Sequence, residues 1–400
     1  MMAGERLSRA WRTIRRVVLN PEPDPQEVSR IGELARARAP VVWLLGKVQS
    51  GKTSIVRAIT GHPDAEIGLG FKPCTRTARV FDFPQDVPVI RFLDSSGLGE
   101  VGYDPTEDLA QLESRAHVVL AVVRAMDTRQ DEILRVLRAV RERHPDWAVV
   151  VALTWLHEGY PEGADHPPYE QLMTAPELAD LRRALERQAA AFRALPGTGA
   201  VHTVPIDFTR PEEGYREEYY GLDALLDALE HAGSAGMDVI LRALTQGDAG
   251  RMMERTRPHV LGYAIAAAAA DVVPMVGLVT VPTIQGKMLH SIGRIHGVTW
   301  DRDTLRRFAA SLGTGTAIGL GVSLGLRQLA KLVPVYGQTV GAAAAGATSF
   351  SVTYALGQAA SYYLATARRR GGADVEQVKR VYRDSLKEAL DMVRKARATK

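Results

Sequence analysis

The chain has 400 residues, 46% of them hydrophobic and 24% charged, a composition typical of a globular protein with room for two or three domains. The single cysteine, Cys74, excludes an intramolecular disulfide framework and a cysteine-rich metal site, and it fits a reducing compartment. The net charge of +4 is about matched by the excess in the first 16 residues, so no nucleic-acid-binding surface is expected.

Residues 1–39 are predicted to form a basic amphipathic arm and a linker. The arm is rich in arginine, at Arg6, Arg9, Arg12, Arg15 and Arg16. On a helix its apolar residues share one face, at Leu7, Trp11, Ile14 and Val18. Two interpretations stay open: an interfacial anchor for anionic lipid, or a helix packed on the protein's own core. The arm has no apolar segment typical of a secretory signal, so we expect a cytoplasmic protein.

Residues 40–235 alternate between apolar runs and amphipathic stretches. The expected strands are 41–45, 78–83, 89–93, 118–123, 149–153 and 201–206. The expected helices are 53–60, 105–115, 128–143, 175–195 and 221–231, after a short helix at 26–38 in the linker. Strands and helices in this order predict an α/β domain with a mostly parallel sheet and flanking helices.

The segment from Gly46 to Thr53 satisfies the P-loop pattern GxxxxGK[ST] between an expected strand and an expected helix. In such a loop, backbone N–H groups surround the phosphates, Lys52 binds the β- and γ-phosphates, and the Thr53 hydroxyl binds Mg²⁺. The nucleotide-binding residues predicted here are Gly46, Lys47, Val48, Gln49, Ser50, Gly51, Lys52, Thr53 and Ser54.

A second motif, DxxG from Asp94 to Gly97, ends the expected strand 89–93. This position places Asp94 beside the metal and the Gly97 amide beside the γ-phosphate. Thr75 lies between the two motifs and is the candidate switch threonine that reaches Mg²⁺, with Thr77 as the alternative. Lys52, Thr75 and Gly97 are the predicted catalytic groups, and Thr53, Thr75 and Asp94 are the predicted metal ligands.

Over residues 40–210 this order of motifs resembles the Era-like small GTPases, which implies GTP and Mg²⁺ as ligands. The guanine-reading motif of that family appears here as Thr154-Trp155-Leu156-His157, without its aspartate. Thr154 keeps the structural part of the motif, and Trp155 is a candidate to stack on the base. The segment from Val204 to Asp207 takes the place of the family's last base-contacting motif and matches it poorly.

The position that orients the attacking water in many GTPases also departs from the common pattern. Leu98 follows Gly97 where Ras-like enzymes carry a water-orienting glutamine. Era-like enzymes can recruit K⁺ through a P-loop asparagine, and Gln49 stands at that place here. We therefore expect slow intrinsic turnover that rises with self-association or an activating partner, with K⁺ as a candidate cofactor.

Residues 236–400 are predicted to form a Gly/Ala-rich all-α domain. Residues 308–326 and 332–367 contain no charged side chain, and they are long enough to cross a bilayer as helices. The stretch 255–365 resembles a YcjF-type domain of unknown function, which implies membrane association. Two options follow, a transmembrane hairpin or a compact bundle that exposes an apolar face.

The sequence therefore predicts a slow GTPase switch that couples its nucleotide state to a helical domain at the inner face of the cell membrane. Its expected partners are guanine nucleotide and a membrane lipid or membrane protein. Two alternatives stay open: a nucleotide-binding membrane scaffold with negligible turnover, and an ATP-specific P-loop enzyme.

Overall fold

The structure, a computed structural model, describes residues 12–19, 25–61, 72–73, 78–95, 118–209, 211–233, 237, 240–241, 244, 251–271, 277–312, 337–370 and 373–398. The chain divides into two compact units. We call residues 40–82 and 90–245 the sheet unit, and residues 1–39, 83–89 and 246–400 the helical unit.

The sheet unit is built on seven strands in the order β2-β3-β4-β1-β5-β6-β7. Their bounds are β1 Val41–Leu45, β2 Lys72–Pro73, β3 Ala78–Phe83, β4 Ile90–Ser95, β5 Val118–Arg124, β6 Val149–Thr154 and β7 Val201–Pro205. Strand β1 pairs in parallel with β4 and β5, β5 with β6, and β6 with β7, whereas β2 is antiparallel to β3. The mostly parallel sheet predicted from the sequence is thus confirmed.

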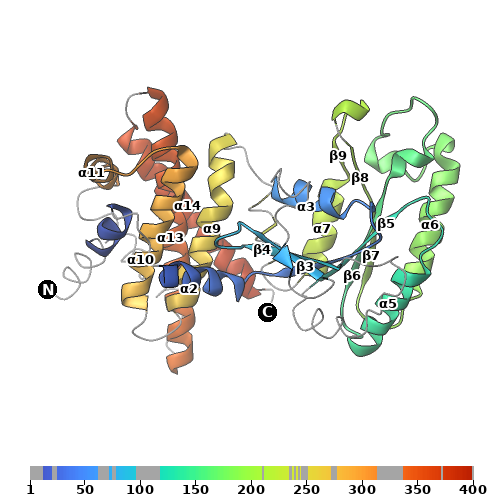
Figure 1. Cartoon of the computed structure of the whole chain (residues 1–400), viewed down its shortest axis with the longest axis horizontal. Helices are drawn as coiled ribbons and strands as arrows, with labels where there is room; N and C mark the ends of the chain where they lie inside the picture. Colours follow the sequence, from blue (N-terminus) through green and yellow to red (C-terminus); the bar gives the residue numbers. More distant parts are fainter. Residues whose placement is uncertain are drawn as a thin grey trace. The chain divides into compact units, whose positions relative to one another are not determined.

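Helices cover both faces of this sheet, with α3 and α7 on one face and α5 and α6 on the other (Figure 1). Their bounds are α3 Lys52–Thr60, α5 Asp131–Arg143, α6 Ala179–Arg193 and α7 Leu222–Ala232. Because both faces are covered, the central strands read as continuous apolar runs, and every residue of β1 and β6 is buried.

Shorter elements complete the sheet unit. Among the described residues of this unit, 3₁₀ helices span Leu156–Gly159, Tyr169–Gln171, Pro176–Leu178 and Pro211–Glu213. A two-stranded antiparallel sheet pairs β8 Asp207–Phe208 with β9 Tyr219–Tyr220. The sequence did not predict β2, β8 or β9, because strands of two residues have too few positions to show alternation. The expected helix at 105–115 lies outside the described residues.

The helical unit contains α2 Pro25–Arg36, α9 Arg251–Asp271, α10 Gly277–His296, α11 Arg302–Ser311, α13 Gly337–Arg370 and α14 Val375–Ala398. Helix α13 packs against α9, α10 and α14. Small polar side chains meet inside the bundle: Thr256 Oγ1 lies 2.6 Å from Ser361 Oγ, and Gln285 donates to Thr353 Oγ1 at 3.1 Å. The predicted C-terminal all-α region is therefore confirmed.

Helix α10 continues through Pro282, which lies inside it. A proline removes one intrahelical hydrogen bond, and packing of the surrounding turns offsets that loss. Over the residues that can be described, no helix has both the length and the apolarity needed to cross a membrane. Most of the charge-free run 308–326 lies outside those residues.

The basic arm is described from residue 12 to residue 19, where it is helical. Ile14 and Val18 are buried, and the arginines Arg12, Arg15 and Arg16 are exposed. The side chain of Val17 lies beside Gly286 of α10, in the same unit. Of the two interpretations of the arm, the structure supports packing on the protein's own core for this apolar face.

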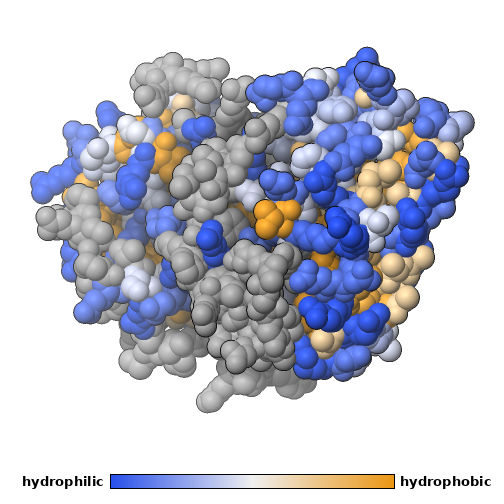
Figure 2. Space-filling view, turned by 45° about the vertical axis from the view of Figure 1, so that its right-hand side comes forward, coloured by the Kyte–Doolittle hydropathy of each residue, from blue (hydrophilic) through white to orange (hydrophobic). Residues whose placement is uncertain are grey.

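The coloured surface in Figure 2 is mostly hydrophilic, with hydrophobic residues in small separate patches. Among the described residues, the large hydrophobic side chains that are exposed are Val48 at 70%, Val375 at 43% and Met173 at 40%. Scattered exposed apolar side chains of this kind are normal on a globular protein and mark no binding surface by themselves. Val48 differs because it belongs to the P-loop.

Candidate nucleotide-binding site

A pocket of about 450 Å³ opens in the sheet unit where α3 begins and β6 ends. Parallel sheets commonly bind ligands at the carboxyl ends of their strands. The lining residues are Gly46, Val48, Gln49, Ser50, Gly51, Lys52, Thr53, Ser54, Ile55, Asp94, Thr154, Trp155, His157, Ile206, Asp207, Phe208 and Glu213. The pocket therefore brings together the predicted P-loop, the predicted metal ligand Asp94 and the predicted base-side residues Thr154 and Trp155.

Two glycines shape the loop. A Cβ on Gly46 would lie 2.4 Å from the Val122 carbonyl oxygen and 2.8 Å from Ser50 Oγ, so a larger residue cannot fit without movement. Gly51 has a φ of 100°, a left-handed conformation that favours glycine. Gly51 also precedes α3, whose first-turn N–H groups have no partner within the helix and bind anions. These features fit the predicted phosphate-binding loop.

Lys52 and Asp94 form a partly buried pair of opposite charges at this end of the pocket. Lys52 Nζ lies 3.8 Å from Asp94 Oδ1 and donates to the carbonyl oxygens of Gly46 at 2.7 Å and Lys47 at 2.9 Å. Burial lowers the pKa of Lys52, which the charge of Asp94 opposes, and burial raises the pKa of Asp94, which Lys52 and Arg79 oppose. The attraction between Lys52 and Asp94 does not fully offset the cost of burying either charge. An anionic phosphate would stabilise Lys52, and a cation would stabilise Asp94.

The donor set beside Lys52 fits Mg²⁺, which prefers oxygen ligands. Within the described part of the chain, no hydrogen-bond donor reaches the buried oxygens Asp94 Oδ1 and Ser50 Oγ. Buried oxygens normally have a hydrogen-bond partner, so these two oxygens point to a bound ligand. Thr53 and Asp94 would hold the ion, and Mg²⁺ would neutralise charge that develops on the phosphates.

The second lysine of the loop has a different role. Lys47 Nζ forms an ion pair with Asp127 at 2.7 Å and donates to the Arg129 carbonyl oxygen. Asp127 follows β5, so this contact ties the P-loop to the neighbouring strand. The ammonium of Lys47 is therefore used for positioning, and that of Lys52 points to the phosphate end of the pocket.

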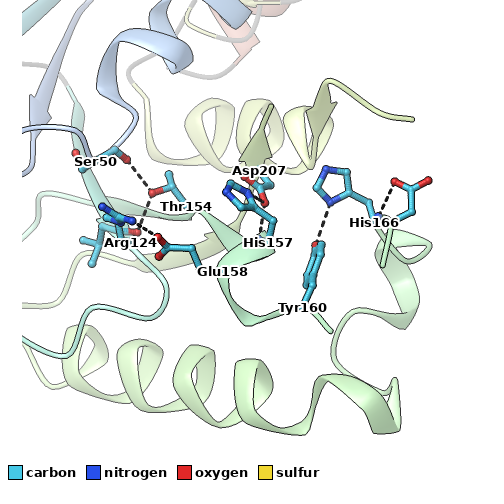
Figure 3. Close-up of polar contacts among 10 residues, drawn as sticks. Ser50, Arg124, Thr154, His157, Glu158, Tyr160, His166 and Asp207 are labelled. Atoms are coloured by element: carbon cyan, nitrogen blue, oxygen red, sulfur yellow. Dashed lines mark hydrogen bonds and ion pairs between the residues drawn. The ribbon is translucent and has the colours of Figure 1, made fainter. Parts of the chain in front are cut away.

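Thr154 joins the P-loop to the end of β6. Its Oγ1 donates to the Ser50 carbonyl oxygen at 2.7 Å and lies 3.2 Å from the Val123 carbonyl oxygen (Figure 3). Thr154 thus forms a hydrogen bond to a residue 104 positions away in the chain.

Trp155, the residue after Thr154, lines the pocket. Its φ is 58°, a left-handed conformation that is uncommon for a bulky residue and that marks a constrained position. The Arg124 guanidinium lies 4.3 Å from the centre of its ring and pairs with Glu158, the contact drawn in Figure 3. One face of the indole is therefore used by a cation, which fixes the orientation of the ring.

Sequence reasoning missed the pair formed by His157 and Asp207. Asp207 Oδ2 accepts from the backbone N–H of His157 at 2.8 Å and lies 2.8 Å from His157 Nδ1 (Figure 3). This hydrogen bond raises the pKa of the His157 imidazole, and burial opposes the rise. The two residues are 50 positions apart, so only the pairing of β6 with β7 could have suggested that they meet.

Two predicted site residues, Thr75 and Gly97, lie outside the described residues. The same holds for Thr77 and for Leu98, which the sequence marks as the departure in the water-orienting position. Their roles therefore stay predictions from the sequence. The site described here consists of the P-loop, Asp94 and the residues that follow β6 and β7.

Comparison with known proteins agrees with this geometry. Residues 41–154 match the protein family described as 50S ribosome-binding GTPase. No curated protein matches the chain. The matched segment contains the P-loop, Asp94 and Thr154, and it is a P-loop GTPase domain, a class that binds guanine nucleotide and hydrolyses GTP, usually with Mg²⁺.

Solved structures give more distant similarities. The small COPII coat GTPase Sar1 from Encephalitozoon cuniculi, in complex with GDP, is 12% identical, with 45% of this chain and 76% of that chain covered and a TM-score of 0.26. LeoA, a bacterial dynamin GTPase from ETEC, is 13% identical, with 99% of this chain and 95% of that chain covered and a TM-score of 0.32.

Proposed function

We propose that this protein is a slowly hydrolysing GTP switch whose nucleotide state controls how its helical residues, 236–400, bind a membrane or a partner protein. The observation that carries the proposal is the partly buried pair of Lys52 and Asp94 beside the glycine-shaped P-loop. GTP with Mg²⁺ would be bound by Gly46 to Ser54 and Asp94, and Thr75 and Gly97 would respond to the γ-phosphate.

Slow turnover follows from the residue next to Gly97. A leucine side chain has no group that can orient an attacking water, so Leu98 leaves that task to another group. Gln49 lines the pocket and carries a side-chain carbonyl oxygen, the type of ligand that K⁺ accepts. We further propose the Era-like subtype for the GTPase domain and K⁺ or a self-associated partner as the accelerating factor.

We propose that exposed arginines attract the protein to an anionic membrane surface. Arg12, Arg15 and Arg16 are exposed on a helix whose apolar face is buried in the helical unit. Each arginine near an anionic membrane surface contributes about 1 kcal/mol of attraction, which salt screens. We propose that this helix, with the YcjF-like residues 255–365, associates with the inner face of the cell membrane.

Phosphate release by the purified full chain tests hydrolysis. We expect release from GTP with Mg²⁺ that falls to background in Lys52→Ala and rises in K⁺ relative to Na⁺. Arg183→Ala, at an exposed position of α6, serves as the matched control and should match the wild type. Release equal to that of Lys52→Ala in both salts, with and without liposomes, would favour the scaffold without turnover and end the GTPase proposal.

Flotation with vesicles tests the membrane proposal. Wild-type protein should float with vesicles that contain anionic lipid, less so as salt rises, and the variant with Arg12, Arg15 and Arg16 changed to glutamine should float poorly. A second variant with Arg135, Arg138 and Arg187 changed to glutamine removes three exposed arginines of the sheet unit and controls for net charge. Equal flotation of both variants would contradict a role for the arm.

A further inference from the structure

The pocket continues beyond the P-loop, and its far end has a defined chemistry. Lys52 and Asp94 lie at the phosphate end. The other lining residues come from the segments that follow β6 and β7, and they are Trp155, His157, Ile206, Asp207, Phe208 and Glu213. If the proposed function is right and the triphosphate lies on the P-loop, the base must occupy this end. Aromatic and apolar walls with a few polar groups are typical of sites for flat ligands.

Asp207 is the buried carboxylate at this end. Its side chain is 3% exposed, and among the described residues its ion pair is with His157. Both contacts with His157, from the backbone N–H and from the ring, use Oδ2, and Oδ1 takes part in neither (Figure 3). His157 therefore fixes Oδ2 through two contacts, and Oδ1, with two lone pairs, keeps acceptor capacity for two further donors.

The edge of guanine supplies such donors. Its N1–H and its 2-amino group both donate on the same side, and a carboxylate accepts from both. Adenine has an acceptor nitrogen at N1 and no 2-amino group, so a carboxylate would face a lone pair there. A site built on buried polar groups rejects a ligand that leaves them without a partner.

We propose that Asp207 is the carboxylate that binds guanine N1–H and the 2-amino group, and that His157 is its positioning residue. In this chain, the acceptor that selects guanine comes from the segment after β7. The position where the GTPase motif would carry an aspartate is occupied by His157, which holds Asp207 through its backbone N–H and its ring.

Glu213 is the competing carboxylate, since it also lines the pocket. It belongs to the 3₁₀ helix Pro211–Glu213 and is exposed, so its charge is screened by water. Asp207 is buried and held by two hydrogen bonds, so it loses little conformational freedom on binding and acts in a lower dielectric. These differences favour Asp207.

Competition against a fluorescent GTP analogue, in Mg²⁺, tests the proposal with GTP, ITP, XTP and ATP. Wild-type protein should bind GTP most tightly, ITP several-fold less tightly because it lacks the 2-amino group, and XTP and ATP at least about tenfold less tightly. Xanthine carries a carbonyl at C2, which a carboxylate repels and to which an amide N–H₂ donates. Asp207→Asn should therefore lose at least about tenfold in GTP affinity and gain affinity for XTP.

Two further variants test whether the change in nucleotide preference is specific to Asp207. Glu213→Gln should keep the wild-type order of nucleotides, and a switch towards XTP in that variant instead of Asp207→Asn would overturn the assignment. Asp180→Asn, at an exposed position of α6 outside the pocket, controls for loss of a charge. If Asp207→Asn does not fold, the wild-type series decides alone, because XTP binding as tight as GTP binding contradicts a carboxylate at that edge.

Different experimental outcomes would overturn the proposed function and the proposed role of Asp207. If no triphosphate binds, or if Lys52→Ala binds the analogue as tightly as the wild type, the P-loop proposal is overturned. If the wild type binds GTP tightly, Lys52→Ala does not, and Asp207→Asn keeps the wild-type order of nucleotides, the P-loop proposal holds and the role of Asp207 is contradicted.

Discussion

At the phosphate end of the pocket, the polar groups come from one segment, Gly46 to Ser54, with Asp94 added from the end of β4. At the opposite end they come from segments far apart in the chain, since Trp155 and His157 follow β6 whereas Asp207 and Phe208 form β8. The first end depends on the backbone shape of one loop, and the second depends on the pairing of β6 with β7. Mutations should therefore act in different ways at the two ends.

The largest effect is expected at Lys52. Lys52→Ala removes the ammonium that faces Asp94, and we expect GTP hydrolysis to fall on the order of a hundredfold, as for loss of a charge-stabilising donor. Lys47→Ala removes an ammonium that pairs with Asp127, so a smaller loss is expected, through looser positioning of the loop. Phosphate release from GTP measures the loss of hydrolysis in both variants. Equal losses would contradict the division of roles between the two lysines.

Gly46→Ala should have the next largest effect. The added methyl group would lie 2.4 Å from the Val122 carbonyl oxygen, and the resulting shift should cost about 1–3 kcal/mol of unfolding free energy and weaken GTP binding. Gly61→Ala is the matched control, because no described atom lies within 4 Å of the position of the added Cβ, and the alanine would be strained only by the φ of 63°. That variant should lose about 1–2 kcal/mol and keep GTP affinity. Denaturant unfolding and nucleotide titration compare the two.

Thr154 connects the two ends, and its loss should affect both moderately. Thr154→Val keeps the shape of the side chain and removes the hydroxyl bound to the Ser50 carbonyl oxygen, which should cost about 1–3 kcal/mol of unfolding free energy. GTP affinity should fall several-fold because the loop loses an anchor. Thr154→Ser keeps the hydroxyl and should restore most of both. An unfolding free energy for Thr154→Val equal to that of the wild type would show that this hydrogen bond is not required.

The smallest effect is a pH dependence at the far end. The pKa of His157 is raised in the folded protein by Asp207, so the added stability is fully present below the unfolded value of about 6.5 and is lost as pH rises through the folded value. Relative to His157→Gln, the wild type should gain about 1 kcal/mol at low pH and less at high pH. In an Asp207→Asn background the difference should vary less with pH, because Glu213 and Glu158 still raise the pKa of His157, and denaturant unfolding at several pH values can check this.

Most of the sheet was predictable because its strands are apolar runs between helices. The bounds of β1 and β3 agree with the sequence prediction, and β4, β5, β6 and β7 differ from it by one or two residues at their ends. Such runs are a local signal, since strands covered on both faces need apolar side chains at every position. The short hairpin of β8 and β9 has no such signal, and it carries Asp207.

The sequence by itself determined the phosphate end of the pocket. The spacing of Gly46, Gly51 and Lys52 within one loop is a local constraint, and any chain with that loop between a strand and a helix presents the same backbone groups. The far end was decided by the tertiary structure. His157 and Asp207 lie 50 positions apart and meet because β6 and β7 are parallel neighbours, so their carboxyl ends share one edge of the sheet.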